Sequence, residues 1–164
     1  MSVELINPFS NEDMSKIEQY DQNNQTDLKR TIESQYSSMN EVTYKKSIIE
    51  SYIVALYLYT TRQGQIDEIC YVNLERDIKK ATIIPISNRK SISRIITKAT
   101  DFIFQTTDIK DLTVIVSQGD KSSQRELENS KYINLGNEDT NTVYYIEQEL
   151  IHDMPTAIFQ RSWI

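Results

Sequence analysis

Three closely spaced segments in the first half of the chain are dense in apolar, β-branched and aromatic residues. They span 51–61, 66–75 and 80–86, and short polar connections separate them, the first around Gly64. β-branched and aromatic side chains fit an extended backbone, and short polar connections containing Gly favour hairpins. The pattern therefore predicts three strands of an antiparallel meander.

A helical pattern follows these strands after a polar, basic loop. The apolar positions recur at spacings of three, one, three, three and one, and they are Ile92, Ile95, Ile96, Ala99, Phe102 and Ile103. These spacings place all six side chains on one face of an α-helix. We expect this face to cover the sheet.

The remaining segments predict a mixed fold. The N-terminal part predicts a strand in 2–9 and two polar surface helices, one starting at Ser10 and one running from Thr26 to near Asn40. The C-terminal part predicts a strand at 111–118, a helix from Asp120, and two closing strands at 131–136 and 142–150. The strand at 111–118 is apolar throughout, so we expect it to be buried on both faces. The order predicts an α/β (α+β) fold, with a mixed, mostly antiparallel central sheet of about six to seven strands, a β-α-β crossover and flanking helices. We expect one domain over 1–164.

Composition narrows the classes of function. The formal net charge is −6, which argues against a general nucleic-acid binder because such proteins need a basic face. We expect no signal peptide and no membrane span, and a cytoplasmic location. The lone Cys70 sits among apolar neighbours and is predicted to be a buried small hydrophobe. With a single histidine, His152, a zinc cluster is not expected, and we expect this residue on the surface or in a turn.

The loop before the predicted helix combines basic and hydroxyl side chains but contains no glycine. It reads Asn88, Arg89, Lys90, Ser91, Ile92 and Ser93, and Arg94 follows. A helix N-terminus with nearby cations favours an anionic ligand such as a diphosphate. The alternative is that Ser87 or Ser91 caps the helix and the basic residues are solvated.

Two local patterns resemble those of the GNAT superfamily of acyl-CoA-dependent N-acyltransferases. The diphosphate loop of that family reads Gln or Arg, two residues, Gly, one residue, then Gly or Ala. In this chain Asn88 stands at the Gln/Arg position, Ser91 at the first Gly and Ser93 at the Gly/Ala position. A proline, Pro85, precedes the loop, as it often does in the family. The element order is also similar to that of the family.

The second pattern follows the strand at 111–118. The family has an Asn, a small residue, a Glu, a Gly and a Phe at fixed spacing. The matching positions here are Asp120, Ser123, Glu128, Lys131 and Tyr132, so three of the five residues differ from the family pattern.

The resemblance implies a site for acetyl-CoA. Pantetheine would run along the backbone of Ile83, Ile84 and Ile86, and the diphosphate would lie over residues 88–93. Asp120 and Ser123 would contact the cofactor, although Asp120 as a helix N-cap is the favoured interpretation.

The resemblance does not supply catalytic residues. The family's tyrosine acid corresponds to Leu127, and the strand at 80–86 offers Lys80 and Thr82 where a carboxylate is expected. Glu75 and Asp77 lie in the preceding strand and turn and are poor substitutes. Three tyrosines are candidates for the cleft, and the sequence does not choose among Tyr71, Tyr144 and Tyr145.

Two functions remain open, with an unrelated α/β binding domain as a third. One is a divergent N-acetyltransferase that uses acetyl-CoA and an amine acceptor, either a small molecule or a protein, for which the acidic balance suits a cation. The other is a catalytically inactive GNAT-fold interaction module that has lost CoA binding. The apolar residues Phe159 and Trp163 near the C-terminus suggest a partner surface, such as that of a homodimer.

Overall fold

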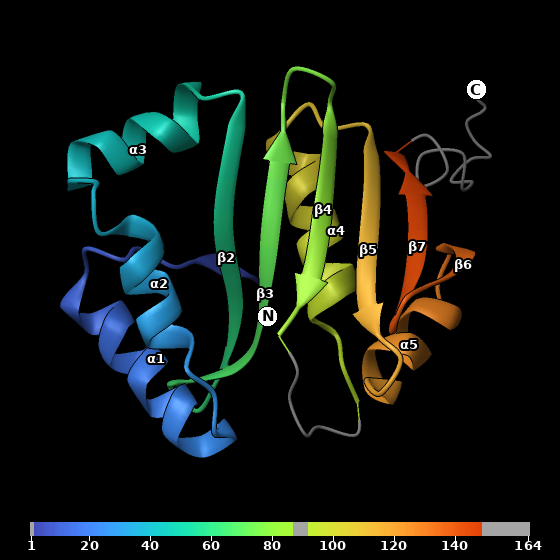
Figure 1. Cartoon of the computed structure of the whole chain (residues 1–164), viewed down its shortest axis with the longest axis horizontal. Coiled ribbons are helices and arrows are strands. Elements are labelled where there is room, and N and C mark those ends of the chain that lie inside the picture. Colours follow the sequence, from blue (N-terminus) through green and yellow to red (C-terminus); the bar gives the residue numbers. More distant parts are fainter. Residues whose placement is uncertain (1, 87–91, 149–164) are drawn as a thin grey trace.

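The computed structural model describes residues 2–86 and 92–148 and contains one mixed sheet (Figure 1). The elements are β1 (Glu4–Leu5), α1 (Asn11–Asn24), α2 (Leu28–Tyr36), α3 (Glu41–Glu50), β2 (Ile53–Arg62), β3 (Gln65–Glu75), β4 (Lys80–Pro85), α4 (Ile95–Thr106), β5 (Asp111–Ser117), α5 (Lys121–Glu128), β6 (Ile133–Glu138) and β7 (Asn141–Glu147). The seven strands lie in the order β1-β2-β3-β4-β5-β7-β6. All neighbours are antiparallel except β4 and β5, which α4 joins in a β-α-β crossover. The predicted fold class is confirmed.

Helices cover the two faces of this sheet unequally. The predicted apolar stripe of α4, including Ile96, Ala99 and Ile103, packs on one face against β2 to β5. Residues of α1, α2 and α3 pack on the opposite face against Tyr57, Tyr59 and other residues of β2 and β3. In Figure 1, α4 lies behind the sheet, and the near side of β4, β5 and β7 carries no helix among the described elements.

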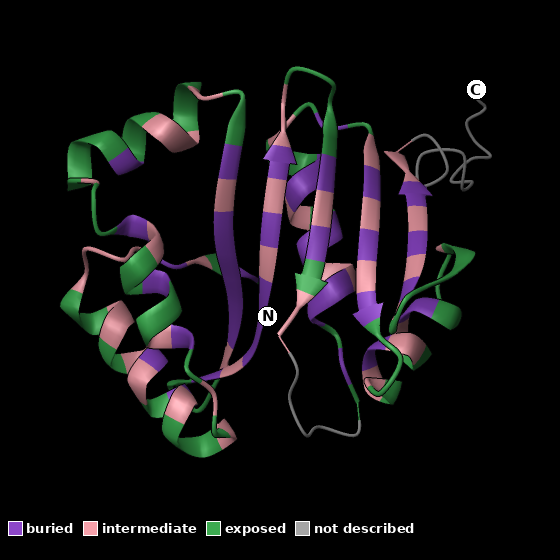
Figure 2. Cartoon of the chain, in the orientation of Figure 1, coloured by how far each residue is buried: buried purple, intermediate pink, exposed green. Residues whose placement is uncertain are grey.

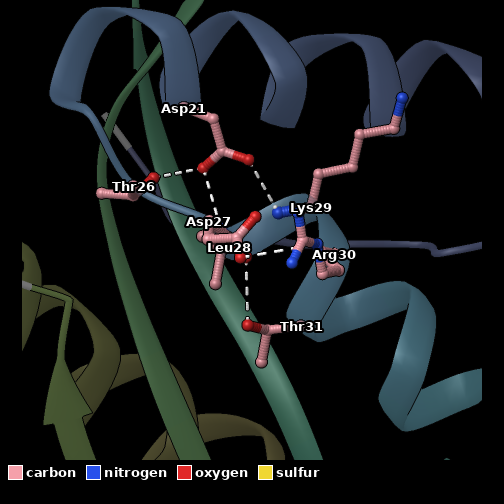
Figure 3. A network of polar contacts seen from close by, with 7 residues as sticks. All are labelled: Asp21, Thr26, Asp27, Leu28, Lys29, Arg30 and Thr31. Carbon is pink, nitrogen blue, oxygen red and sulfur yellow. Dashed lines mark hydrogen bonds and ion pairs between the residues drawn. The ribbon is translucent and has the colours of Figure 1, made fainter.

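Local capping explains where α1 and α2 begin. Ser10 is the N-cap of α1 and its hydroxyl accepts from the Asp13 N–H, as the sequence predicts. α2 is capped from α1 instead: the carboxylate of Asp21 accepts the N–H groups of Leu28 and Lys29 and the hydroxyl of Thr26 (Figure 3). A carboxylate beside a helix N-terminus satisfies unpaired donors and complements the helix dipole.

The helix α3 is absent from the sequence prediction. Asn40 was expected to end the second helix; instead α2 ends at Tyr36, and Asn40 caps α3 by accepting from the Thr43 N–H. The apolar residues of α3 form no continuous stripe and Tyr44 is its one buried residue, so the sequence shows little helical period.

The prediction that β5 is buried on both faces is wrong. Leu112, Val114 and Val116 are buried, whereas Thr113 and Ile115 between them are half-buried. The buried set faces α4 and α5, and the alternate set lies on the face that these helices do not cover. Figure 2 shows the resulting alternation along β5, and it also shows that β6 is exposed along its length.

Three further predictions concern Cys70, the closing strand pair and membrane-spanning helices. Cys70 is fully buried, as expected. The closing strand pair is present, and its turn lies at Asp139 and Thr140. Gly136 occupies an irregular position of β6 with a φ of +103°. None of the helices in the described residues is long and apolar enough to cross a membrane.

Candidate functional site

The parallel strands β4 and β5 separate partway along their length. Their pairing runs from Lys80 with Asp111 to Ile83 with Val114 and then ends. β4 continues to Pro85 beside β3, while β5 continues to Ser117 beside β7. The arrowheads diverge accordingly in Figure 1. Beyond Ile83, the β5 side of β4 therefore has no strand partner among the described residues, and we call this separation of the two strands the opening.

The predicted cofactor residues of β4 lie at this opening. Ile84 is the first residue of β4 beyond the pairing, and it lies opposite Tyr71 of β3. The side chain of Ile84 is partly exposed, and Ile86 packs against the cluster formed with α1 and α2. Both lie on the face opposite α4.

Of the predicted loop, the structure describes Ile92 and Ser93, which precede α4. This helix begins at Ile95, so Ile92, the first residue of the predicted apolar face, lies outside it. Ile92 is exposed, whereas Ser93 is buried. Several residues singled out in the sequence lie outside the described residues: Ser87, Asn88, Arg89, Lys90, Ser91, His152, Phe159 and Trp163.

A carboxylate that the sequence reasoning missed lies against this end of α4. Glu68 on β3 is buried, and its carboxylate accepts the Ser93 hydroxyl at 2.8 Å and the Arg94 N–H at 3.3 Å. Burial raises the pKa of Glu68; the two hydrogen bonds oppose this, and the nearby Glu126 and Asp67 add to it. The sequence contains a signal for this position: Glu68 lies two residues from Cys70 on the same strand, so both side chains point to the core side of the sheet.

A second carboxylate reaches the same helix turn from α5. Glu126 Oε2 accepts the N–H of Thr97 at 2.9 Å and its hydroxyl at 2.8 Å. The other oxygen, Oε1, is buried and has no hydrogen-bond partner among the described residues. The first turn of α4 is thus held by acidic side chains from β3 and from α5.

A cavity of about 400 Å³ opens beside this turn. Its lining includes three cationic side chains, Arg62, Arg94 and Lys98, and two carboxylates, Asp67 and Glu68. Thr60 also lines it, is buried, and has a hydroxyl without a hydrogen-bond partner among the described residues. Cations, a helix N-terminus and an unpaired hydroxyl form a donor set suited to an anion.

The predicted residues of α5 contact each other. Asp120 is the N-cap: Oδ1 accepts the Ser123 N–H at 3.1 Å, and Oδ2 accepts the Ser123 hydroxyl at 2.7 Å. Both side chains are engaged in starting the helix. Their contact with a cofactor stays a prediction.

The structure separates the three candidate tyrosines. Tyr144 is buried on the α5 side and donates to Glu128 at 3.0 Å. Tyr145 lies at the opposite end of β5 from the opening, with its hydroxyl 2.8 Å from Asp111 and from Glu147. Only Tyr71 of the three lies across from Ile84. Leu127, at the family's tyrosine position, is buried in the core.

Tyr71 also lines a second cavity, of about 570 Å³, between α2 and the sheet. The described residues around it are Arg30, Thr31, Ser34, Gln35, Tyr57 and Tyr71. The rings of Tyr57 and Tyr71 meet edge to face at 5.2 Å. Burial, with Tyr71 adding, raises the pKa of Tyr57 to about 12, so this hydroxyl stays protonated at neutral pH.

No family model and no curated protein sequence matches the chain. Solved structures do match. The dodecameric spermidine N-acetyltransferase from Vibrio cholerae superposes with a TM-score of 0.60 at 13% identity, over 94% of this chain and 97% of the other. The PaiA N-acetyltransferase from Thermoplasma acidophilum, in complex with coenzyme A, gives 0.54 at 12% identity, over 90% and 99%.

A third structure, the N-acetyltransferase PseH of Campylobacter jejuni in complex with acetyl coenzyme A, gives a TM-score of 0.57 at 11% identity, over 89% of this chain and 99% of the other. Identities this low establish a fold and do not transfer residue roles. The separated strands β4 and β5, the crossover helix α4 and the coverage of nearly the whole length agree: the chain has the fold of the GNAT N-acetyltransferase superfamily.

Proposed function

We propose that the protein is a divergent N-acetyltransferase that moves an acetyl group from acetyl-CoA to a primary amine. The observation that carries this proposal is the opening between β4 and β5, which lies where the chain leads into the N-terminus of α4. An extended thioester cofactor needs such an opening for its arm and a helix N-terminus for its phosphates.

The donor set fits the cofactor in part. The end of β4 at Ile84 and Ile86, beyond its pairing with β5, would hold pantetheine, and residues 88–93 with the Arg94 and Lys98 side chains would hold the diphosphate. Two N–H groups near the start of α4, those of Arg94 and Thr97, already bond to carboxylates of the protein. We therefore expect weaker cofactor binding than a free helix terminus would give.

The reaction needs few protein groups. The acceptor nitrogen attacks the thioester carbonyl, an N–C bond forms, the C–S bond breaks, and the amine proton is lost as the thiolate leaves and is protonated. We assign Tyr71 as the candidate proton donor to that sulfur, because it lies across from Ile84 and lines the second cavity. Leu127 cannot take this role, since its side chain has no transferable proton and is buried.

The second cavity supports an acceptor other than a polyamine. Its described lining has two aromatic rings, hydroxyl and amide groups and one cation, Arg30, and no carboxylate. A multiply charged amine needs acidic partners in its pocket. We therefore favour an amine that carries polar uncharged or anionic groups, in place of the cation that the net charge alone suggested.

Two measurements test the proposal. Calorimetric titration with acetyl-CoA is expected to show binding, and transfer to a panel of amines is expected to favour uncharged or anionic acceptors over spermidine. Tyr71→Phe is expected to lower kcat by about 10²–10⁴-fold, which is what one proton donor typically contributes, with an unchanged Kd for acetyl-CoA. Tyr144→Phe is the matched control, because its hydroxyl lies on the other face. Absence of binding at millimolar acetyl-CoA would refute the proposal.

The second candidate function is a GNAT-fold interaction module without turnover. The buried Leu127 and the occupied N–H groups of α4 favour it. This module has lost CoA binding, so a folded chain that shows no binding at millimolar acetyl-CoA would support it. A homodimer and a cytoplasmic location stay predictions under either function.

A further inference from the structure

We propose that Glu68 and Glu126 are built-in competitors for the phosphates of the cofactor, so that the protein restrains its own CoA affinity. This inference rests on the proposed function for the identity of the ligand. It concerns residues outside the loop and strand that the resemblance singled out. It also explains why a serine stands at position 93.

Glu68 lies against the start of α4. The residue is 4% exposed and belongs to β3, yet its carboxylate accepts from Ser93 and Arg94 at the start of α4. The Ser93 hydroxyl is therefore directed to Glu68 in this structure. At this position the family pattern has Gly or Ala, neither of which offers a hydroxyl. Ser93 here supplies the donor that keeps a buried carboxylate next to the helix.

Glu126 approaches the same turn of α4 from another element. Glu68 belongs to β3 and Glu126 to α5, and they accept from residues 26 and 29 positions away in sequence. A helix N-terminus attracts negative charge from any source. Two carboxylates that already accept two of its N–H groups reduce the gain from a diphosphate and repel it through a partly desolvated medium.

The surroundings of this turn retain features of an anion site. The lining of the cavity beside the turn includes Arg62, Arg94 and Lys98, in excess over Asp67 and Glu68, and the buried hydroxyl of Thr60, which has no partner among the described residues. Internal carboxylates alone do not account for an unpartnered buried donor. The arrangement fits an anion that displaces or shares the donors now bonded to Glu68.

The test is a calorimetric titration of wild type, Glu68→Gln and Glu126→Gln with coenzyme A and, separately, with adenosine 3′,5′-bisphosphate. Gln keeps the size of each side chain and removes the charge. Each variant is expected to bind both ligands at least about fivefold more tightly, in line with removal of one nearby like charge. Glu128→Gln is the control, since that side chain lies on α5 but bonds to Tyr144.

The outcomes separate the two proposals. If wild type binds CoA and neither Gln variant binds more tightly, the inference fails while the proposed function stands. If wild type fails to bind but the double variant Glu68→Gln/Glu126→Gln binds, competition is supported and the acetyltransferase proposal fails. If no variant binds either ligand although thermal melting shows all are folded, both proposals fail. Lys98→Ala is a further comparison. Lys98 lines the cavity, so this variant should bind both ligands more weakly while melting at the same temperature as wild type.

Discussion

The N-termini of α2 and α4 are both held by carboxylates from other elements, but in different ways. At α2, Asp21 lies only seven and eight residues before the N–H groups that it accepts, and it closes one local turn (Figure 3). At α4, Glu68 and Glu126 come from 26 and 29 residues away and lie beside a cavity with three cations. The same interaction therefore starts a helix at α2, whereas at α4 we propose that it also occupies a ligand position.

The α2 end should behave as a purely structural cap. Asp21→Ala removes acceptors from two N–H groups and one hydroxyl, so it is expected to lower the free energy of unfolding by about 2 kcal/mol. Urea denaturation measures this loss, and the Kd for coenzyme A should not change. Asp27→Ala is the control: Asp27 stands at the N-cap of α2 but makes no side-chain capping bond, and its ion pair with Arg30 is exposed. Equal losses in the two variants would contradict the assignment of the cap to Asp21.

The Ser93–Glu68 bond should have a smaller, coupled effect. Ser93→Ala removes a buried donor, and we expect a loss of about 1 kcal/mol in unfolding free energy because Glu68 keeps its charge with one hydrogen bond fewer. In Glu68→Gln the same Ser93→Ala change should cost less, and a double-mutant cycle in urea measures the difference. Ser130→Ala serves as control, as its exposed hydroxyl bonds only a backbone carbonyl. Additive losses would show that the two side chains act independently.

Sequence reasoning predicted some parts of this molecule and missed others for physical reasons. The stripe of α4 from Ile95 onward and the chain order of the strands follow from local periodicity, so they were predicted correctly, whereas Ile92 is exposed. α3 has little periodicity, and its start depends on the Asn40 cap, so it was missed. A strand's second face is buried only if a helix covers it, which the apolar run at β5 does not reveal.

In the candidate site too, the sequence revealed the positions that depend on local motifs and missed a contact that depends on the tertiary structure. The strand and loop positions were found from local motif spacing, and the roles predicted for Ile84, Ser93 and Asp120 stay predictions. Glu68 was missed because its contact with Ser93 spans 25 residues and depends on how β3 extends past the end of β4. Local patterns show where a helix N-terminus lies, but a charged group that reaches it from another strand needs the tertiary structure.

The smallest expected effect is the pH dependence of the α4 end. Burial raises the pKa of Glu68 above its ordinary value of 4.5, so folding disfavours its charged form. A raised carboxyl pKa contributes stability that is fully present below the ordinary value and is lost as pH rises through the higher folded value. Glu68→Gln stays neutral and avoids that loss. The variant should therefore gain stability relative to wild type between about pH 4.5 and pH 7.5, by less than about 1 kcal/mol.

Melting temperatures at the two pH values measure this gain, and Glu128→Gln corrects for the general effect of losing one negative charge. Asp101, whose pKa burial also raises, is present in all of these proteins and cancels from the difference. If Glu68→Gln is less stable than wild type at pH 7.5, the ionised carboxylate stabilises α4 by more than its desolvation costs. Glu68 would then be a structural cap like Asp21, and the distinction between the two helix ends would rest on Glu126 and the cationic cavity alone.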